Sequence, residues 1–188
     1  MTKPSASWLP GVHPAPNIQG DPDAYEIENR ATDPEHRIEA AMRAVADWRD
    51  ADVLDLGAGT GYHVPSFAAT ARHVYAVEPD DPSRLLAMAR LARLGLRNAS
   101  VLTGSAAAIP LRDASVDVAH ARFAYFWGPG CEPGIAELGR VLRPGGTAFV
   151  IDNDYRSGTF ASWIRRTSPR RAATPTPSRP SGPPWDSR

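Results

Sequence analysis

The chain has 188 residues, of which 42% are apolar, and its 21 basic side chains balance 21 acidic ones. This composition is typical of a globular protein with one core, and no apolar run reaches the roughly 20 residues of a membrane span. Residues 1–10 lack the basic start and apolar segment of a secretory signal. Cys131 is the only cysteine, which excludes an internal disulfide and a multi-cysteine metal site and favours a reducing, cytoplasmic location.

Charges and prolines are spread unevenly along the chain. Residues 1–22 hold five prolines and predict a flexible arm, whereas residues 23–162 carry periodic patterns and predict one folded domain. Residues 163–188 have no periodicity, six prolines, and six arginines against one acid, which predicts a disordered tail. The rest of the chain then has fifteen basic and twenty acidic side chains, a balance that disfavours nucleic acid as a partner.

Helical and strand patterns alternate through this domain. Residues 23–50 have a helical pattern, in which Asp33 and Pro34 predict a capped start and an apolar stripe runs from Ile38 to Trp48. Strands are then expected at residues 53–56, 73–78, 99–104, 116–121 and 147–152, and helices at residues 62–71, 83–94 and 133–142, the last ended by Arg143 to Gly146. The alternation predicts an α/β fold: a doubly wound, mostly parallel sheet with helices on both faces.

The segment after the first strand is rich in glycine and reads D-L-G-A-G-T-G at residues 55–61. Its spacing differs from the dinucleotide-binding G-x-G-x-x-G, because Tyr62 replaces the third glycine, and no phosphate-binding G-x-x-x-x-G-K-[S/T] occurs. Ligands of doubly wound sheets bind beyond the carboxyl ends of the strands, so we expect this bare backbone to lie against a ligand. Asp55 places a carboxylate there, which suits an ammonium group better than a phosphate.

A second acid ends the second expected strand. Glu78 follows Gly61 by seventeen residues, at a position where a carboxylate can accept hydrogen bonds from both hydroxyls of a ribose. A ribose-binding acid, bare backbone and no phosphate clamp together favour a nucleoside that carries an amino-acid-like tail.

Four segments, in order, resemble the motifs of the class I S-adenosylmethionine (SAM)-dependent methyltransferases, in particular their small-molecule branch. They are D-L-G-A-G-T-G (55–61), V-Y-A-V-E-P-D (74–80), L-T-G-S-A-A-A-I-P-L (102–111) and L-G-R-V-L-R-P-G-G (138–146). Their order and spacing make the resemblance specific, and it covers residues 53–152. It implies the Rossmann-like fold of that family, with SAM as the cofactor.

The resemblance also implies a cofactor site at the strand ends. The glycine loop would approach the methionine part and ribose of SAM, the acid of the second motif would bind the ribose hydroxyls, and the third motif would lie at the adenine edge. Ala121 and Arg122, after the fourth strand, would lie near the sulfonium. The cofactor-binding residues expected in this way are Asp55, Gly57, Ala58, Gly59, Gly61, Glu78, Pro79, Ser105, Ala106 and Ala121.

The chain departs from the family pattern in two places. Ser105 stands where the third motif usually carries an acid that accepts from the adenine amino group, so adenine recognition is expected to be looser. The family's sixth strand and antiparallel seventh strand have no counterpart, since the proline- and arginine-rich tail begins where they should follow. The tail resembles a reading frame that is shifted or cut short, and it would leave residues 147–152 with an unpaired edge.

Other residues near the strand ends fit either a site or a structural role. His63 and His120 are candidate bases, although a lone histidine is more often a packing or surface residue. The aromatic run 123–127 lines either a substrate pocket or the core, residues 152–155 form either a substrate contact or a loop, and residues 25–29 form either a lid or a solvated helix.

The function expected from these residues is SAM-dependent methyl transfer to a small-molecule acceptor, with no metal, membrane or nucleic acid involved. Proximity and alignment suffice for displacement at a sulfonium methyl group, so no catalytic residue is named, and a base is needed only if the nucleophile must lose a proton. One alternative is a SAM-binding protein or truncated methyltransferase fragment with impaired catalysis. The other is an NAD-dependent oxidoreductase, which the loop spacing disfavours. The acceptor, the atom methylated and the oligomeric state stay open.

Overall fold

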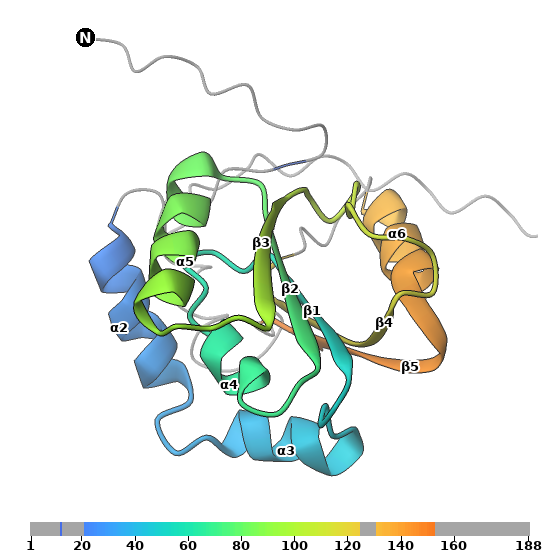
Figure 1. Ribbon diagram of the computed structural model, residues 1–188, viewed down its shortest axis with the longest axis horizontal. Helices are drawn as coiled ribbons and strands as arrows, with labels where there is room; N and C mark the ends of the chain where they lie inside the picture. The colour runs from blue at the N-terminus through green and yellow to red at the C-terminus, as the bar shows by residue number, and fades with distance from the viewer. Residues whose placement is uncertain (1–11, 13–20, 125–130, 153–188) are drawn as a thin grey trace, which may run out of the picture. The chain divides into compact units, whose positions relative to one another are not determined.

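A computed structural model describes the chain at residue 12 and at residues 21–124 and 131–152 (Figure 1). The chain divides into one unit of residues 1–152 and a second of residues 153–188, and only the first contains described residues. The expected tail therefore lies outside the described residues, as do most of the expected arm and the last ten residues of the expected domain.

Five strands form one parallel sheet in the order β3-β2-β1-β4-β5 (Figure 1). They are β1 Asp52–Leu56, β2 His73–Glu78, β3 Ala99–Thr103, β4 Val116–Arg122 and β5 Leu142–Ile151. β1 lies at the centre between β2 and β4, so the strand order reverses on either side of it. The expected doubly wound, mostly parallel sheet is confirmed, and in the described part of the chain β3 and β5 form its two edges.

Helices cover both faces of this sheet (Figure 1). α3 (Arg37–Val45), α4 (Val64–Ala68) and α5 (Asp81–Arg93) lie on one face, and α6 (Glu132–Val141) lies on the other. α2 (Pro22–Thr32) lies beside α5, to which an ion pair between Glu26 and Arg90 joins it at 2.7 Å. Within the described ranges, no helix is both long enough and apolar enough to cross a membrane.

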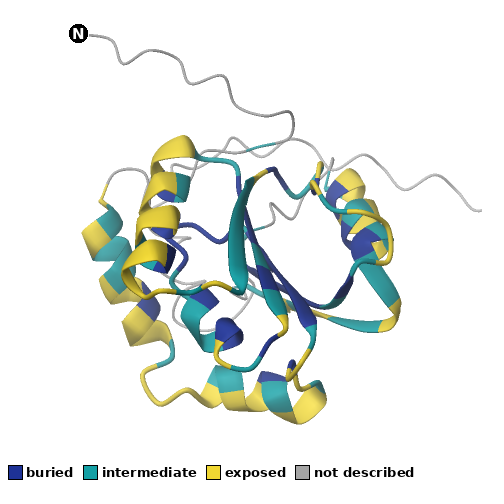
Figure 2. Cartoon of the chain, in the orientation of Figure 1, coloured by how far each residue is buried: buried dark blue, intermediate teal, exposed yellow. Residues whose placement is uncertain are grey.

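The central strands are buried on both faces, which explains their continuous apolar runs. All five residues of β1 are buried (Figure 2). Neighbouring residues of the strand belong to different hydrophobic clusters. Val53 packs with Trp48 and Phe67 on the face of α3 and α4, whereas Leu54 packs with Leu138 of α6. Each fully buried side chain of this size contributes about 1.5–3 kcal/mol to folding, so the two clusters fix the position of β1.

The expected helix of residues 23–50 is two helices, and its expected start is wrong. α2 ends before Asp33, residues 34–36 form a turn, and α3 begins only after His36, which is left-handed with φ of 54°. The Asp33 carboxylate still caps α3, accepting from the amides of Ile38 (3.1 Å) and Glu39 (3.2 Å) across the turn. Because α3 ends at residue 45, Val45 is exposed, and Trp48 enters the core from the loop instead.

The fifth strand starts earlier than expected. Residues 143–146 were expected only to end the preceding helix, but β5 already begins at Leu142, which pairs with Val116 of β4. The next paired residues are Val118 and Thr147, so the Pro-Gly-Gly segment forms a bulge between the two registers. Proline and glycine interrupt the ladder locally without ending the strand, as is usual for bulges.

Candidate functional site

The candidate site lies at the carboxyl ends of β1, β2 and β4, where the strand order reverses. The two loops at such a reversal run to opposite faces of the sheet and leave a crevice between them. The glycine loop begins directly after Leu56 of β1, and the amides of Gly57 and Ala58 donate to the carbonyl of Val77 at 2.8 and 3.1 Å. These bonds fix the start of the loop against the end of β2.

The three loop glycines all have left-handed backbones, with φ of 69°, 55° and 73° at Gly57, Gly59 and Gly61. Side chains are strained in this region, so the turn itself favours glycine. A Cβ on Gly57 would lie 2.7 Å from the Cβ of Ala124, and a Cβ on Gly61 would lie 3.1 Å from the Cβ of Ala87 in α5. The first and third glycines therefore also allow close packing within the protein.

Glu78 is the buried acid at the end of β2, with 7% of its surface exposed. Its Oε2 accepts from the amide of Gly59 at 2.8 Å, and its Oε1 accepts from the amide of Asp80 at 2.9 Å. Burial raises the pKa of this carboxyl group, and the two amide donors oppose that rise. A carboxylate oxygen has two lone pairs, so each oxygen of Glu78 keeps the capacity to accept one further hydrogen bond.

Asp55 is paired inside the protein rather than with the loop. Its Oδ1 lies 2.8 Å from Nδ1 of His120 on the neighbouring strand β4, and both side chains are almost fully buried. Because the carboxylate accepts, His120 carries a proton on Nδ1. The other oxygen, Oδ2, is buried and has no hydrogen-bond partner among the described residues.

The remaining expected residues lie along the same edge. The amide and carbonyl of Ser105 bond to Ala108 at 3.2 and 3.1 Å, and its buried Oγ has no partner in the described part of the chain. Pro79 offers its carbonyl to Arg84 at 2.8 Å. Ala106 packs against the core on the α6 face, and Ala121 is buried in β4.

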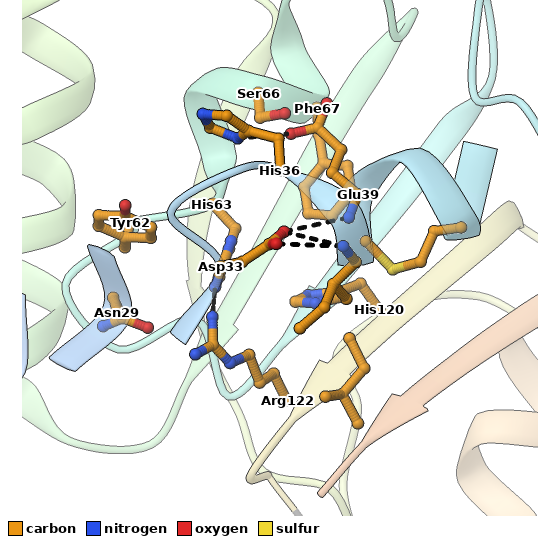
Figure 3. Close-up of a pocket in the computed structure, with 13 residues that line it drawn as sticks. Asn29, Asp33, His36, Glu39, Tyr62, His63, Ser66, Phe67, His120 and Arg122 are labelled. Carbon is orange, nitrogen blue, oxygen red and sulfur yellow. Dashed lines mark hydrogen bonds and ion pairs between the residues drawn. The ribbon is translucent and has the colours of Figure 1, made fainter. Parts of the chain in front are cut away.

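A cavity of about 150 Å³ lies next to this edge, and none of the ten expected cofactor residues lines it (Figure 3). Its walls come from α2, α3, the segment from Tyr62 to Phe67, and the ends of β4 and β5. The lining residues are Asn29, Asp33, His36, Ile38, Glu39, Met42, Tyr62, His63, Ser66, Phe67, His120, Arg122 and Ile151. A cavity of this volume is large enough for a molecule about the size of benzene.

Two candidate bases from the sequence, His63 and His120, meet in this cavity, with their ring centroids 5.0 Å apart. Nη1 of Arg122 lies 2.9 Å from Nε2 of His63 (Figure 3). An arginine can only donate, so Nε2 accepts and the His63 proton lies on Nδ1. Burial above all, together with the neighbouring His120 and Arg122, lowers the pKa of His63 to about 4, and the attraction of Asp55 opposes this shift.

α2 is tied to the glycine loop as well as to α5. Glu26 accepts from the hydroxyl of Thr60 in the loop and pairs with Arg90. Asn29 is buried on the same helix and lines the cavity. Residues 25–29 therefore belong to a helix that borders the cavity, with Asn29 buried and Glu28 exposed, and a role as a lid stays a prediction.

In a comparison with known protein families, a family model described as a methyltransferase domain aligns with residues 53–146. The matched segment is half of the chain and contains the glycine loop and Glu78. The chain belongs to this methyltransferase family.

Individual relatives agree with this membership. A malonyl-(acyl-carrier protein) O-methyltransferase of Methylococcus capsulatus is 36% identical over 96 residues, covering 51% of this chain and 35% of that protein. The uncharacterized methyltransferase Rv3342 of Mycobacterium tuberculosis is 36% identical over 146 residues, covering 76% and 53%. Among solved structures, a SAM-dependent methyltransferase from Aquifex aeolicus has a TM-score of 0.58 at 24% identity, over 71% of this chain and 77% of that one, which shows the shared fold.

The chain thus spans between about a third and a half of the length of these two curated relatives.

Sequence reasoning on this methyltransferase domain missed the contact between Glu26 and Thr60, because no sequence pattern links two residues that are 34 positions apart. It named Arg122 only as a neighbour of the sulfonium, and the pairing of His120 with Asp55 was not foreseen. The signal that could have found that pair is parallel register, since the two residues are aligned partners on β1 and β4.

Proposed function

We propose that this protein transfers the methyl group of SAM to a small-molecule acceptor, and that the ten residues named from the sequence hold the cofactor. Family membership supports SAM-dependent methyl transfer in general. Because the chain spans only part of its relatives, the activity of the whole protein is part of the proposal.

The observation that carries the proposal is the arrangement of Glu78 and the glycine loop. A buried carboxylate held by two backbone amides is fixed in direction, and one lone pair on each oxygen is left to accept a ribose hydroxyl. The loop reads G-x-G-x-G and not the dinucleotide-binding G-x-G-x-x-G, which argues against a dinucleotide such as NAD.

Two unpartnered buried oxygens fit the rest of the cofactor. Oδ2 of Asp55 can accept from an ammonium group such as that of the methionine part, and Oγ of Ser105 can accept from the adenine amino group. Buried polar atoms without partners are rare in folded proteins, and a bound ligand is one way to complete their hydrogen bonds. These residues therefore match both polar ends of SAM.

Bound SAM supplies a methyl group on a positively charged sulfur, which is already a good leaving group. The protein's own residues then need to bind and align: Glu78 fixes the ribose, the loop presents backbone, and the cavity beside β4 would hold the acceptor close to the reacting centre. The volume of that cavity supports a small molecule as acceptor. The single cysteine supports a cytoplasmic location.

A SAM-binding protein with impaired catalysis is the second candidate. It is compatible with the same cofactor residues and with the edge position of β5 within the described residues. Such a protein would bind the cofactor and its product without turnover.

Isothermal titration of the full chain with S-adenosylhomocysteine, with NAD as control, tests the proposed site. We expect micromolar binding of the former, no binding of NAD, and loss of binding in Gly59→Arg, which fills the loop next to Glu78. Binding of NAD, or no binding of S-adenosylhomocysteine by folded protein, would contradict the proposal. Release of S-adenosylhomocysteine from SAM in an acceptor screen then separates an enzyme from a binding protein.

A further inference from the structure

Arg122 is a buried cation at the end of β4 that lines the cavity. Only 7% of its surface is exposed, and its Nε is buried with no hydrogen-bond partner among the described residues. Its Nη1 donates to His63 at 2.9 Å, and its guanidinium carbon lies 5.3 Å from the ring centroid of Phe123. Neither partner carries a negative charge.

The acids that share the cavity are engaged elsewhere. Asp33 accepts from the backbone amides at the start of α3, and Glu39 pairs with Arg43 at 3.1 Å. Among the described residues, Arg122 forms no ion pair with any carboxylate. A buried charge without a paired counterion is costly, so a negatively charged ligand next to Arg122 would be stabilised there.

The surroundings restrict what that ligand can be. The cavity has apolar lining residues, among them Ile38, Met42 and Phe67. Arg122 and His63 lie together in it (Figure 3). A planar guanidinium with a free Nε–H matches the geometry of a carboxylate. The available space suits a molecule with one ring or a short branched chain.

We propose that this cavity binds the methyl acceptor and that the acceptor is a small carboxylic acid, whose carboxylate is held by Arg122. The inference rests on the proposed function. It goes further by naming the substrate class and a residue that recognises it. Because SAM carries a positive sulfonium, a bound carboxylate would also reduce the repulsion between the two cations in one site.

The cofactor itself offers a second source of a carboxylate, at its methionine end. We assign the Arg122 site to the acceptor because none of the ten expected cofactor residues lines the cavity. Two ligands, S-adenosylhomocysteine and 5′-methylthioadenosine, distinguish these sources. 5′-Methylthioadenosine has the nucleoside and sulfur of S-adenosylhomocysteine but lacks its carboxylate, so an arginine that binds the cofactor carboxylate would contribute only to the binding of S-adenosylhomocysteine.

The test uses the full chain, with benzoate as probe and benzamide as its uncharged counterpart. We expect benzoate to bind more tightly than benzamide and to shift the NMR signal of the Arg122 Nε–H. Arg122→Gln should weaken benzoate binding about ten- to a hundred-fold, the range for a charge-assisted hydrogen bond, and leave the affinities for S-adenosylhomocysteine and 5′-methylthioadenosine unchanged. Arg97→Gln, at an exposed arginine, is the control and should change neither.

Three results would overturn the assignment. They are equal affinity for benzoate and benzamide, absence of benzoate binding, and an Arg122→Gln variant that loses affinity for S-adenosylhomocysteine but not for 5′-methylthioadenosine. The last would assign the arginine to the cofactor. If Arg122→Gln does not fold, the assignment is still tested in the unaltered protein, by the relative affinities of benzoate and benzamide and by the shift of the Arg122 Nε–H signal. Failure of benzoate with intact binding of S-adenosylhomocysteine refutes this inference alone, and the proposed function would stand.

Discussion

Acidification should destabilise the protein through His63, which is half-buried and neutral in the folded state. Its pKa is about 4 in the folded protein, against about 6.5 for an unperturbed histidine. Between these values the unfolded chain binds the proton and the folded protein does not, so stability is complete above pH 6.5 and is lost as the pH falls towards 4.

The size of the effect follows from the two pKa values. Proton linkage with 6.5 and about 4 gives a loss of about 2 kcal/mol between pH 7.5 and pH 5, and about 3 kcal/mol below pH 4. For a unit of this length, 2 kcal/mol corresponds to a fall in Tm of about 4–8 °C.

The assay is urea unfolding at pH 7.5 and pH 5, with His63→Gln as the test variant. Glutamine keeps an oxygen that can accept from Arg122 but does not titrate, so the loss on acidification should be about 2 kcal/mol smaller than in the unaltered protein. His36→Gln, at an exposed histidine, serves as the control and should lose as much as the unaltered protein. An equal loss in His63→Gln, or an NMR titration midpoint of His63 near 6.5, would refute the reasoning.

Two further predictions concern the loop and the helix next to it. Gly61→Ala should destabilise by about 1–3 kcal/mol in urea unfolding, because its φ is 73° and its Cβ would meet Ala87 at 3.1 Å. Gly139→Ala, in α6 with open space around it, should be neutral or stabilise by about 1 kcal/mol, and equal losses in both would contradict the packing argument. Glu26→Gln removes the charge that pairs with Arg90, so amide exchange in α2 should accelerate while that of the sheet does not. Unchanged exchange in α2 would show that this contact does not hold the helix.

The sheet could be predicted from the sequence because its signals are local. Each strand is a short apolar run, and alternation with helical patterns leaves few topologies for a parallel sheet. The errors fall where tertiary contacts override local preference. Asp33 and Pro34 match the usual pattern of a helix start, yet a turn follows Asp33. The Asp33 carboxylate caps α3 across this turn, through the amides of Ile38 and Glu39. Gly145 and Gly146, which were expected to end a helix, lie instead in a bulge of β5, because α6 already ends at Val141.

Part of the candidate site could be predicted from the sequence, because the signals of that part are also local. The glycine loop and Glu78 lie in contiguous motifs at strand ends, where the residue types and their spacing indicate a nucleoside site. The cavity beside them is built from α2, α3 and the ends of β4 and β5, segments that no spacing rule connects. Arg122 shows the difference clearly, because its identity is visible in the sequence but its burial without a counterion is not.

The central claim is that Glu78 and the glycine loop bind the nucleoside of SAM, and the affinity of Glu78→Gln for S-adenosylhomocysteine tests it most directly. Glutamine keeps the size of the side chain but replaces one acceptor oxygen with a donor, so we expect a loss of about ten- to a hundred-fold. Glu137→Gln, at a carboxylate that bonds Arg140 and the amide of Ile109, is the matched control and should bind as the unaltered protein does. Equal affinity of Glu78→Gln and the unaltered protein would contradict the account.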